Sequence, residues 1–535
     1  MTESRLPGIL AFEMMAKAED QPDFPVITFE TQPYPDEILT YSDLVLKGNK
    51  LVQALKDNGI GAGDTFSVVM RNHPEMVMAM YAASALRAII VPIDPRSKGE
   101  KLAYQIENSG SKGVIFAAEL MDNMEAALTS LQEVKTVGVM YRDYFEVPAT
   151  TKHPNLNEIL AGPEAVGIDP ADHSPKDFSL IIYTSGTTGN PKGVKKRAEA
   201  YSSYSLMSNM IWQYTPEDKL YTGLSLTHGN AQAVTMGPAL ALSIPAVISR
   251  KFTKSRIWDI CRQYGCTSFS LLGGMMTGIY AEPMKPNDAE NPVRKVLTAG
   301  TPAKIWKAFE DRFGVNIHEW YAAMEGGFAH NPPGEGPVGS FGRPLEGFTE
   351  MKVVRDDDSE CDPGEIGEII SKMASAKPEV VYHGNKEASE SKTRGGWLRS
   401  GDMAHRDKEG WFYFDFRKGG GLRRQGDFIM PEYVEAVMAE HPDINDICVF
   451  GIKAPSGAPG ESDLVAAIVP PADVKPDIKS IFETCRKGLE GNSVPSYIQV
   501  VDEIPKTISE KNLTRILSDA FTIEDSGVHS FSDYR

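Results

Sequence analysis

Short apolar runs alternate with longer helical patterns through most of the chain before residue 400. Residues 65–70, 89–93 and 113–117 are short and rich in β-branched side chains, as buried strands usually are, whereas residues 74–88 are long enough for an apolar helix. Comparable short runs follow at residues 178–183, 245–250, 267–272 and 295–299. Because this alternation is typical of crossover units, the sequence predicts an α/β fold with a large layered N-terminal domain and mainly parallel sheets.

The pattern changes after Asp402. Residues 409–428 combine an aromatic hairpin pattern with KGGG at residues 418–421, the most flexible tetrapeptide in the chain. Two helices and two strands are then predicted, at residues 431–441, 446–452, 464–470 and 474–490. These elements are enough for a small mobile C-terminal α+β domain with a core of its own.

Three segments follow from this change of pattern. We expect an N-terminal domain over residues 1–417, a C-terminal lid domain over residues 418–520, and a polar tail over residues 521–535. Lys418 and Gly419 are the predicted hinge between the two domains. A chain of 535 residues is longer than one hydrophobic core usually grows, which agrees with more than one domain.

Composition narrows the class of protein. Hydrophobic residues make up 41% and charged residues 24%, close to average globular usage, which excludes a disordered, collagenous or heptad-repeat chain. With 55 Lys+Arg against 73 Asp+Glu, the net charge of -18 repels phosphate polymers and anionic lipid, although a local basic pocket can still hold one small anion. We therefore expect no nucleic-acid partner.

Cysteine use and hydropathy indicate where the protein works. The five cysteines form no CxxC pair and have no His-rich tract beside them, so we expect reduced thiols and neither a disulfide frame nor a zinc site. The longest uncharged run, residues 220–249, is broken by Pro238 and Pro245, and the N-terminus meets charged residues too early for a signal peptide. The sequence therefore predicts a cytoplasmic protein without an integral membrane segment.

The sharpest chemical signal is a loop rich in glycine and hydroxyl groups. Residues 183–193 read YTSGTTGNPKG and lie directly after the apolar run LIIY. Such a loop can turn successive backbone N–H groups inward, and Lys192 adds a positive charge, so the segment suits a polyphosphate. It is not the P-loop pattern, because no GK[ST] follows the first glycine at the required spacing. The alternative is an ordinary Ser/Thr/Gly turn.

This loop resembles the phosphate-binding signature of the acyl-adenylate-forming enzymes, which include acyl-CoA synthetases, firefly-type luciferases and peptide synthetase adenylation domains. Other motifs of that family follow in the same order and extend the resemblance over nearly the whole chain. Residues 296–302 are similar to the strand and turn that border the adenine, and residues 320–326 are similar to the family's YGxTE. The resemblance implies that Tyr321 stacks on adenine and that Glu325 holds magnesium together with Thr184.

A ribose-binding pair completes the nucleotide site that the resemblance implies. Asp402 resembles the aspartate of the family's TGD segment, which accepts hydrogen bonds from both ribose hydroxyls, and a carboxylate suits this role because it only accepts. Arg417 stands at the place of a family arginine that also contacts the ribose. The residues implied for ATP are Thr184, Ser185, Gly186, Thr187, Thr188, Gly189, Lys192, Ala299, Gly300, Thr301, Pro302, Tyr321, Ala322, Asp402 and Arg417.

Four positions depart from the family's motifs. Ala322 replaces the usual glycine and Met324 the usual threonine, which affects a local hydroxyl contact and the pocket floor but not the metal ligand. Gly419 stands where the family has a charged hinge residue, so flexibility is kept without the charged contact. Glu510 replaces a glycine that shapes a turn.

The resemblance also implies residues for catalysis and for the other substrates. Lys511 ends a segment similar to the family's PKTxxGK and would be the catalytic lysine, although alone it would be taken for a solvated surface lysine. His228 falls at the wall between acid and nucleotide and is expected in both the catalytic site and the acyl pocket, with a structural histidine as the alternative. Gly273 and Gly274 are expected in the acyl pocket, and Gly426 near coenzyme A.

Taken together, the chain resembles an ATP-dependent acid:CoA ligase that makes an acyl adenylate and then an acyl-CoA thioester. The implied partners are ATP, Mg²⁺, CoA and an aliphatic or bulky carboxylic acid of fatty-acid-like, carnitine-like or steroid-like type, and a homodimer is possible. Three alternatives remain: a free-standing enzyme that loads a carrier protein, a luciferase-like oxygenase, and a non-catalytic nucleotide-binding regulator. Retention of the implied phosphate, metal, ribose and lysine positions argues against the regulator.

Overall fold

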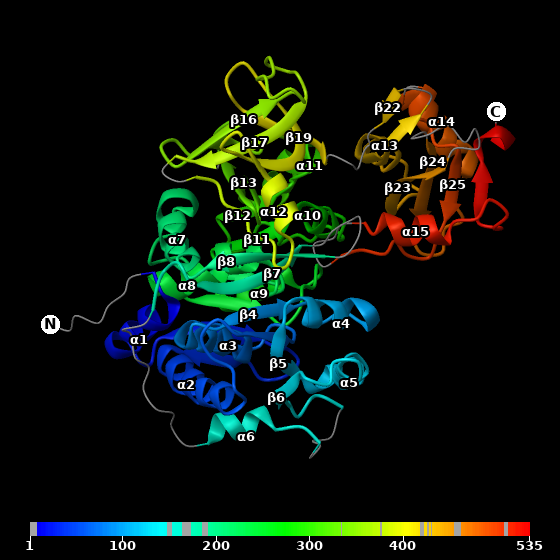
Figure 1. Cartoon of the computed structure of the whole chain (residues 1–535). Helices are drawn as coiled ribbons and strands as arrows, with labels where there is room; N and C mark the ends of the chain where they lie inside the picture. The colour runs from blue at the N-terminus through cyan, green and yellow to red at the C-terminus, as the bar shows by residue number, and fades with distance from the viewer. Residues whose placement is uncertain are drawn as a thin grey trace. The chain divides into compact units, whose positions relative to one another are not determined.

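Two compact units make up the computed structural model of the chain (Figure 1). The first takes in the chain up to residue 184 and residues 191–351 and 371–399, and the second takes in residues 352–370 and the chain from residue 400 onward. The structure describes residues 8–146, 152–162, 173–184, 191–332, 334–374, 377–417, 422–424, 427–429, 431–453, 462–489, 491–507 and 512–534.

A six-stranded sheet in the first unit has the strand order β6-β5-β3-β4-β7-β8. Its neighbours are parallel, except that β8 runs antiparallel to β7. Every residue of β3 and β4 is buried, which explains why these strands are recognisable in the sequence as continuous apolar runs. The strands are β3 (Thr65–Val69), β4 (Ile89–Ile93), β5 (Ser111–Ala117), β6 (Lys135–Met140), β7 (Phe178–Thr184) and β8 (Lys192–Arg197).

Helices pack around this sheet, as Figure 1 shows for the blue and cyan part of the chain. The helix α3 begins with Pro74 and ends before Arg87, which adopts the left-handed conformation, and all of its residues are buried. Thr40 and Asp43 form a capping box that starts α2. These helices are α2 (Tyr41–Asp57), α3 (Pro74–Leu86), α4 (Gly99–Asn108), α5 (Met121–Leu128) and α6 (Leu156–Ala161).

A nine-stranded sheet follows the order β15-β14-β13-β12-β11-β9-β10-β1-β2. The strands from β13 to β1 are parallel to their neighbours, and antiparallel pairs close both edges. The carboxyl ends of β11, β12 and β13 therefore meet at one edge, where α/β proteins usually bind ligands. The strands are β1 (Pro25–Glu30), β2 (Glu37–Thr40), β9 (Leu220–Thr222), β10 (Ala246–Ser249), β11 (Ser268–Leu272), β12 (Lys295–Ala299), β13 (Asn316–Ala323), β14 (Gly326–Asn331) and β15 (Arg343–Pro344).

The helices that accompany the nine-stranded sheet connect its strands. The helix α9 has one apolar face and ends at Gly265 in the left-handed conformation, and α11 ends in the same way at Gly314. They are α1 (Leu10–Asp20), α7 (Ala200–Met207), α8 (Gly237–Leu242), α9 (Ile257–Tyr264), α10 (Gly273–Tyr280) and α11 (Ala303–Phe313), with π-helical turns at Ser208–Trp212 and Ala231–Met236.

A third sheet has the order β16-β17-β19-β18, with β20 paired to β19. The hairpin predicted over residues 409–428 is wrong in its pairing: its aromatic strand β20 pairs with the preceding strand β19, and residues 422–424 and 427–429 form a separate short hairpin. The elements are β16 (Thr349–Val354), β17 (Gly367–Met373), α12 (Lys386–Ser391), β18 (Thr393–Arg394), β19 (Trp397–Arg406) and β20 (Phe412–Arg417).

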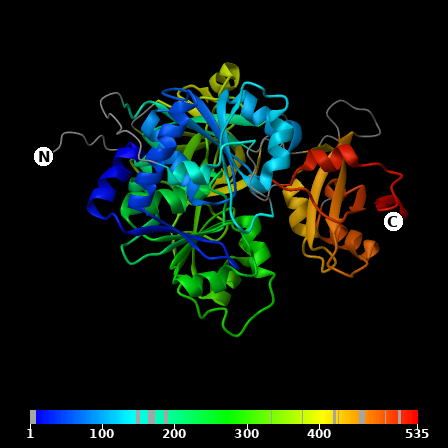
Figure 2. The same cartoon turned by 90° about the horizontal axis from the view of Figure 1, so that it is seen from below.

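The C-terminal part of the second unit has a four-stranded sheet in the order β23-β24-β25-β26. Alternate residues of β23 and β24 pack on opposite faces: Val449 and Leu464 join the core under α13 and α14, whereas Phe450 and Val465 join the core under α15. Figure 2 shows α14 and α15 on opposite sides of these strands. The elements are α13 (Pro431–Met438), β23 (Asp446–Lys453), β24 (Ser462–Val469), α14 (Ile478–Gly488), β25 (Tyr497–Val500), α15 (Thr514–Ala520) and β26 (Val528–Ser530), preceded by the hairpin β21 (Leu422–Arg424) and β22 (Asp427–Ile429).

The α/β fold with a large, partly parallel N-terminal region and a smaller C-terminal domain is thus confirmed. The predicted polar tail differs in one respect, because Val528–Ser530 forms the edge strand β26 and Phe531 packs on Phe482. Apolar side chains spaced between polar ones let this segment close the sheet. Among the described residues, no helix is long and apolar enough to cross a membrane.

Candidate active site

The predicted phosphate loop connects two paired strands. Tyr183 lies opposite Gly193 and Thr184 opposite Lys192 in the antiparallel pair of β7 and β8. A Cβ atom on Gly193 would lie 2.7 Å from the Ile181 side chain, so this position has no room for a larger residue. Ser185, Gly186, Thr187, Thr188 and Gly189 lie outside the described residues, as does the Thr184 side chain, and their roles stay predictions.

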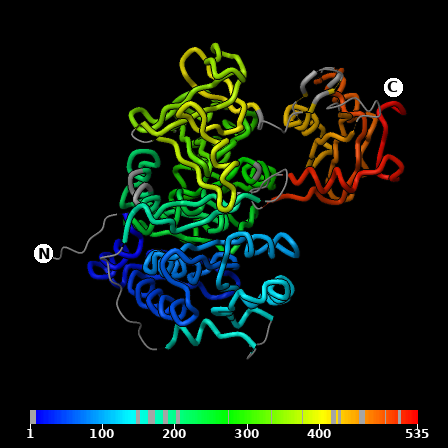
Figure 3. The backbone as a smooth tube through the Cα atoms, viewed as in Figure 1, coloured from blue at the N-terminus to red at the C-terminus, as the bar shows by residue number. Residues whose placement is uncertain are grey.

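The segment at residues 380–383 lies beside β8, the strand that follows the predicted phosphate loop (Figure 3). The backbone N–H of Lys195 donates to the Val381 carbonyl at 2.9 Å, and that of His383 donates to the Gly193 carbonyl at 2.8 Å. Tyr382 is buried between these contacts, and the Lys192 ammonium lies 5.5 Å from the centre of its ring. Tyr382 was not predicted from the sequence, yet it contacts both β8 and Glu325, the carboxylate predicted to hold magnesium.

Glu325 receives a hydrogen bond from Tyr382. The tyrosine hydroxyl donates to Glu325 Oε1 at 2.5 Å, across a gap of 57 residues in the chain. Glu325 lies in the turn between β13 and β14, and Gly326 and Gly327 follow it with positive φ angles of 136° and 84°. A Cβ on Gly327 would lie 2.8 Å from the Ser371 hydroxyl, so this tight turn requires glycine.

Lys196 is a second residue that the sequence analysis missed. Its ammonium donates to the Met324 carbonyl, the last backbone oxygen before Glu325. Burial lowers the pKa of Lys196, and the negative charge of Glu325 opposes that effect. The signal in the sequence is the Lys195-Lys196-Arg197 run, which continues directly from a loop that was itself recognised as cationic.

The chemistry of these side chains fits a magnesium site. Carboxylate and hydroxyl oxygens are the ligands that Mg²⁺ prefers, and Glu325 with Thr184 would supply one of each. The hydrogen bond from Tyr382 fixes one oxygen of the carboxylate, as partners of metal ligands commonly do. Met324 stands where the resembled family usually has threonine. Its side chain packs against the cluster of Val194, Tyr382 and Leu398 and does not replace Glu325.

The residues implied for adenine lie on two adjacent parallel strands. Ala299 ends β12, Gly300 follows with a φ of 83°, and Thr301 and Pro302 lead into α11. Tyr321 lies on β13, partly buried, with its ring centre 4.8 Å from that of Phe341. Ala322, the next residue, is exposed.

Glu319 supports this region and is a third residue that was not predicted. It lies two residues before Tyr321 on the same face of β13 and accepts a hydrogen bond from the Gly300 N–H at 2.6 Å. Burial raises the pKa of Glu319 to about 7, although hydrogen bonds from Thr301 and Gly300 oppose the shift. The signal in the sequence is a carboxylate inside a buried strand, which requires hydrogen-bond donors.

The residues implied for the acyl pocket lie near the same strand ends. His228 Nδ1 accepts from the Asn230 N–H at 3.2 Å, which places the proton of the neutral ring on Nε2. Buried Asn72 holds the preceding loop, since its amide donates to the Leu224 carbonyl at 2.9 Å and its oxygen accepts from the Leu226 N–H at 2.8 Å.

Gly273 makes the closest contact in this region. It starts α10 at the end of β11, and a Cβ there would lie 1.8 Å from the Gly300 carbonyl oxygen. The implied acyl-pocket and adenine segments are therefore packed backbone to backbone. Gly274 follows in the same helix.

The residues implied for ribose are cross-strand neighbours along the backbone in the second unit. Asp402 on β19 lies directly opposite Arg417 on β20. Asp402 is buried, its N–H donates to the Ser400 hydroxyl at 2.9 Å, and the Gly401 N–H donates to Glu368 Oε1 at 3.1 Å. The prediction of two ribose ligands in one site is thus consistent with their cross-strand register.

The implied hinge, CoA and lysine positions fall outside the described residues: Lys418, Gly419, Gly426 and Lys511. Lys506 and Asn512, which flank the lysine segment, form an isolated antiparallel bridge. The Lys506 ammonium pairs with Asp446 at 2.5 Å, so Lys506 already has an ionic partner within the small domain.

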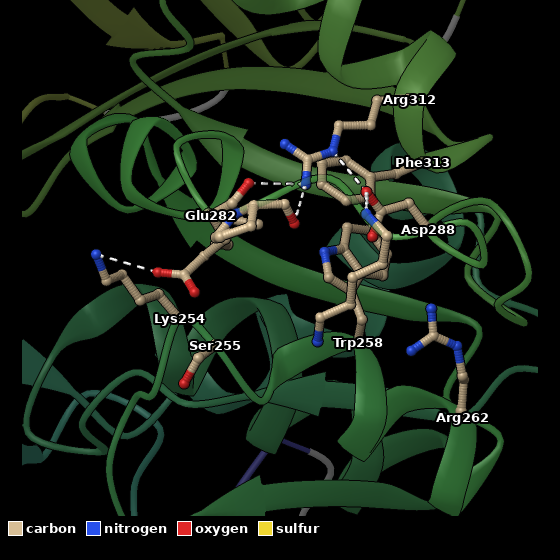
Figure 4. Close-up of a pocket in the computed structure, with 11 residues that line it drawn as sticks. Lys254, Ser255, Trp258, Arg262, Glu282, Asp288, Arg312 and Phe313 are labelled. Carbon is tan, nitrogen blue, oxygen red and sulfur yellow. Dashed lines mark hydrogen bonds and ion pairs between the residues drawn. The ribbon is translucent and has the colours of Figure 1, made fainter.

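A separate pocket lies between α9, α10 and α11, and none of its lining residues is an implied site residue (Figure 4). Its charges are internally paired: Arg312 lies 2.7 Å from Asp288, and Lys254 lies 3.2 Å from Glu282. Arg312 also donates to the Tyr280 carbonyl at 2.6 Å. The pocket is therefore a structural junction of helix ends.

Comparison with known proteins agrees with this geometry. A family model described as AMP-binding enzyme matches residues 14–376, and one described as AMP-binding enzyme C-terminal domain matches residues 433–511. The chain therefore belongs to the AMP-binding enzyme family. Its curated relatives place it in the acyl-CoA synthetase branch.

Two relatives and one solved structure illustrate the likeness. The chain is 28% identical over 488 residues to a medium/long-chain-fatty-acid–CoA ligase of Mycobacterium marinum, with 91% of this chain and 92% of the relative covered. It is 26% identical over 496 residues to a crotonobetaine/carnitine–CoA ligase of Salmonella typhi, covering 89% and 92%. A crystal structure of o-succinylbenzoate CoA synthetase from Bacillus subtilis, in complex with ATP and magnesium ion, has a TM-score of 0.76 at 22% identity and covers 94% and 98%.

Proposed function

We propose that the protein is an ATP-dependent acid:CoA ligase that forms an acyl adenylate and then an acyl-CoA thioester. The observation that carries the proposal is the convergence of Lys192, Tyr382 and Glu325 beside the phosphate loop, in a chain that belongs to the AMP-binding enzymes. A cation, a buried hydroxyl and a carboxylate at one place suit a nucleotide polyphosphate with its metal ion.

In the first half-reaction, a carboxylate oxygen of the acid attacks the α-phosphorus of ATP, and pyrophosphate leaves. Lys192 and the backbone N–H groups of the loop stabilise negative charge on the leaving phosphates. Magnesium, held by Glu325 and Thr184, would neutralise further charge there when bound. Lys511 would bridge the acid oxygen and the α-phosphate.

In the second half-reaction, the pantetheine sulfur of CoA attacks the acyl carbonyl, the thiol proton is released, and AMP leaves. The small domain would rotate about residues 418 and 419, removing Lys511 and presenting the backbone near Gly426 to the thiol. One site would in this way serve two transition states.

The acid substrate is proposed as a class. The two relatives named above act on a fatty acid and on a betaine by their names, so an aliphatic or bulky acid is favoured over acetate. A panel of such acids, assayed for AMP release with and without CoA, tests the proposal. Acid-dependent AMP release that requires CoA for turnover supports a ligase, whereas turnover only with a carrier protein supports the loading enzyme.

A further inference from the structure

Glu319 is held by the turn that follows β12. Its carboxylate accepts from the Gly300 N–H at 2.6 Å, the Thr301 N–H at 3.2 Å and the Thr301 hydroxyl at 2.5 Å. The side chain is 3% exposed, so water cannot replace these contacts. Three donors converge on one carboxylate, and the carboxylate fixes two consecutive residues of the turn.

The turn at residues 300 and 301 depends on contacts from other segments to keep its conformation. Gly300 has a positive φ and no side chain, and a Cβ on Gly273 would collide with its carbonyl oxygen, so the backbone there depends on outside contacts. Glu319 supplies them from the neighbouring strand, two residues from Tyr321. The carboxylate therefore couples the end of β12 to the strand that carries the tyrosine.

Among the described residues, no charged group contributes to the shifted pKa of Glu319. Thr298 of β12 and Asn331 of β14 lie at the same register on either side, and both are neutral. Two titratable groups nearby, His318 and His330, belong to the opposite face of the sheet because side chains alternate along a strand. There, His318 Nε2 lies 3.2 Å from His330 Nδ1. On the turn, Thr301 contacts Glu319 through its backbone N–H and its hydroxyl, and neither group is charged.

Protonation changes what Glu319 can accept. A carboxylate is acceptor-only, whereas a carboxylic acid carries a donor that would point toward a set of donors. Burial raises the pKa of Glu319 to about 7, within the range that an assay can scan. The ionised form accepts all three contacts as charge-assisted hydrogen bonds, whereas in the acid the Thr301 hydroxyl would have to turn and accept, and the remaining contacts would be weaker neutral ones.

We propose that Glu319 is a positioning residue of the nucleotide site, whose carboxylate holds the turn at residues 300 and 301 in its ligand-binding conformation and holds it less firmly on protonation. The inference rests on the proposed function, because it is the resemblance to adenylate-forming enzymes that assigns this turn to the adenine of ATP. It adds a proton-dependent control of nucleotide affinity to that site.

The test is the pH dependence of ATP binding, measured by calorimetry from about pH 5.5 to 8.5. In the unmodified protein, the affinity for ATP should fall as pH drops below about 7, by no more than about tenfold for each pH unit. Glu319→Gln should bind ATP about tenfold more weakly at pH 8 and lose this component of the pH profile. Titration of ATP itself is common to all variants, so the difference between profiles isolates the residue.

A matched control lies in the C-terminal domain. Glu435 is partly buried, with a pKa raised by burial to about 7, and accepts from the Val449 N–H at 2.7 Å. Glu435→Gln should leave the ATP profile as in the unmodified protein. An equal change in both variants would overturn the inference, because it would reflect a general effect of a buried carboxylate.

A second variant keeps the test decisive if Glu319→Gln does not fold. Thr301→Val removes one donor and leaves the carboxylate, so its ATP profile should keep its shape with the midpoint moved to higher pH. An unmoved midpoint overturns the inference. Loss of ATP binding in the unmodified protein at every pH would instead refute the proposed function, so the two failures are distinguishable.

Discussion

Tyr382 donates a hydrogen bond of 2.5 Å to the Glu325 carboxylate, although 57 residues separate them in the chain. The contact exists because the backbone at residues 381–383 pairs with β8, which follows the phosphate loop. A magnesium ligand fixed in this way loses less freedom when the metal binds. One buried tyrosine thus joins β8, which follows the predicted phosphate loop, to the predicted metal carboxylate.

Removing this hydroxyl should weaken the metal site without unfolding the protein. In Tyr382→Phe the ring stays, with its contact to Lys192, and only the hydrogen bond is lost. We expect the magnesium concentration for half-maximal adenylation to rise by about tenfold. Tyr413→Phe, in a hairpin of the second unit, is the matched control and should change nothing. An unaltered magnesium titration in Tyr382→Phe would separate the tyrosine from the metal site.

The contact between Gly273 and the Gly300 carbonyl predicts a steric effect on nucleotide binding. Gly273→Ala places a methyl group where the backbone oxygen lies, so the turn must shift, at a cost of about 1 to 3 kcal/mol. We expect a raised KM for ATP and a lower thermal midpoint. Gly278→Ala in the same helix meets only the Lys254 side chain at 3.6 Å and should be tolerated. Equal behaviour of the two variants would contradict the packing argument.

Glu37 should make the first unit sensitive to acid. Burial raises its pKa, but the neighbouring His73 ring and the hydrogen bond and positive charge of Arg142 outweigh burial and lower the pKa to about 2. Because the folded pKa lies below the unfolded value, the ionised carboxylate stabilises the fold above about pH 4.5, and this stability is lost as pH falls toward 2. After screening by solvent, we expect about 1 to 2 kcal/mol.

Acid unfolding of Glu37→Gln checks this prediction. The unmodified protein should lose that increment of stability between about pH 5 and 2, and the variant should not. Glu387→Gln, at an exposed position of α12, provides the control. Parallel acid profiles for the unmodified protein and Glu37→Gln would show that the Arg142 pair does not contribute.

Lys511 should matter in only one half-reaction. Loss of a preorganised donor typically costs ~10² to 10³ in rate, so Lys511→Ala should slow adenylation at least that much. Thioester formation from a chemically supplied acyl adenylate should remain nearly unchanged, because the lysine would then be rotated away. If both rates fall together in a folded protein, the domain rotation is refuted. If neither falls, Lys506 is the next candidate.

The predictable parts of the molecule are those with local signals. The strands at residues 65–69 and 89–93 are buried on both faces, so apolar runs reveal them. The aromatic strand at residues 412–417 is also recognisable, but its pairing with residues 397–406, which sets Asp402 opposite Arg417, was not predicted. Tyr382 gives no local signal, because its role arises from a bridge to β8. Residues 528–530 form a strand, but Val528 is their only apolar residue, so no strand pattern was visible there.

Glu319 and Lys196 show a second reason why sequence reasoning stops short. Each is a charged residue in a strand, a pattern that indicates a solvated edge as readily as a buried contact. Their partners, the Gly300 N–H and the Met324 carbonyl, are backbone atoms and leave no trace in residue identity. Only the arrangement of neighbouring strands shows where such a group is directed.

The exchange of labelled pyrophosphate into ATP, in the absence of CoA, tests the central claim most directly. An acid that supports turnover should also support exchange in the unmodified protein, because the acyl adenylate forms reversibly before the thiol reacts. Glu325→Gln should reduce this exchange by about 10² while the fold stays intact. Exchange that appears only when CoA is present, or exchange that is equal in Glu325→Gln, would contradict a separate adenylation step at this site.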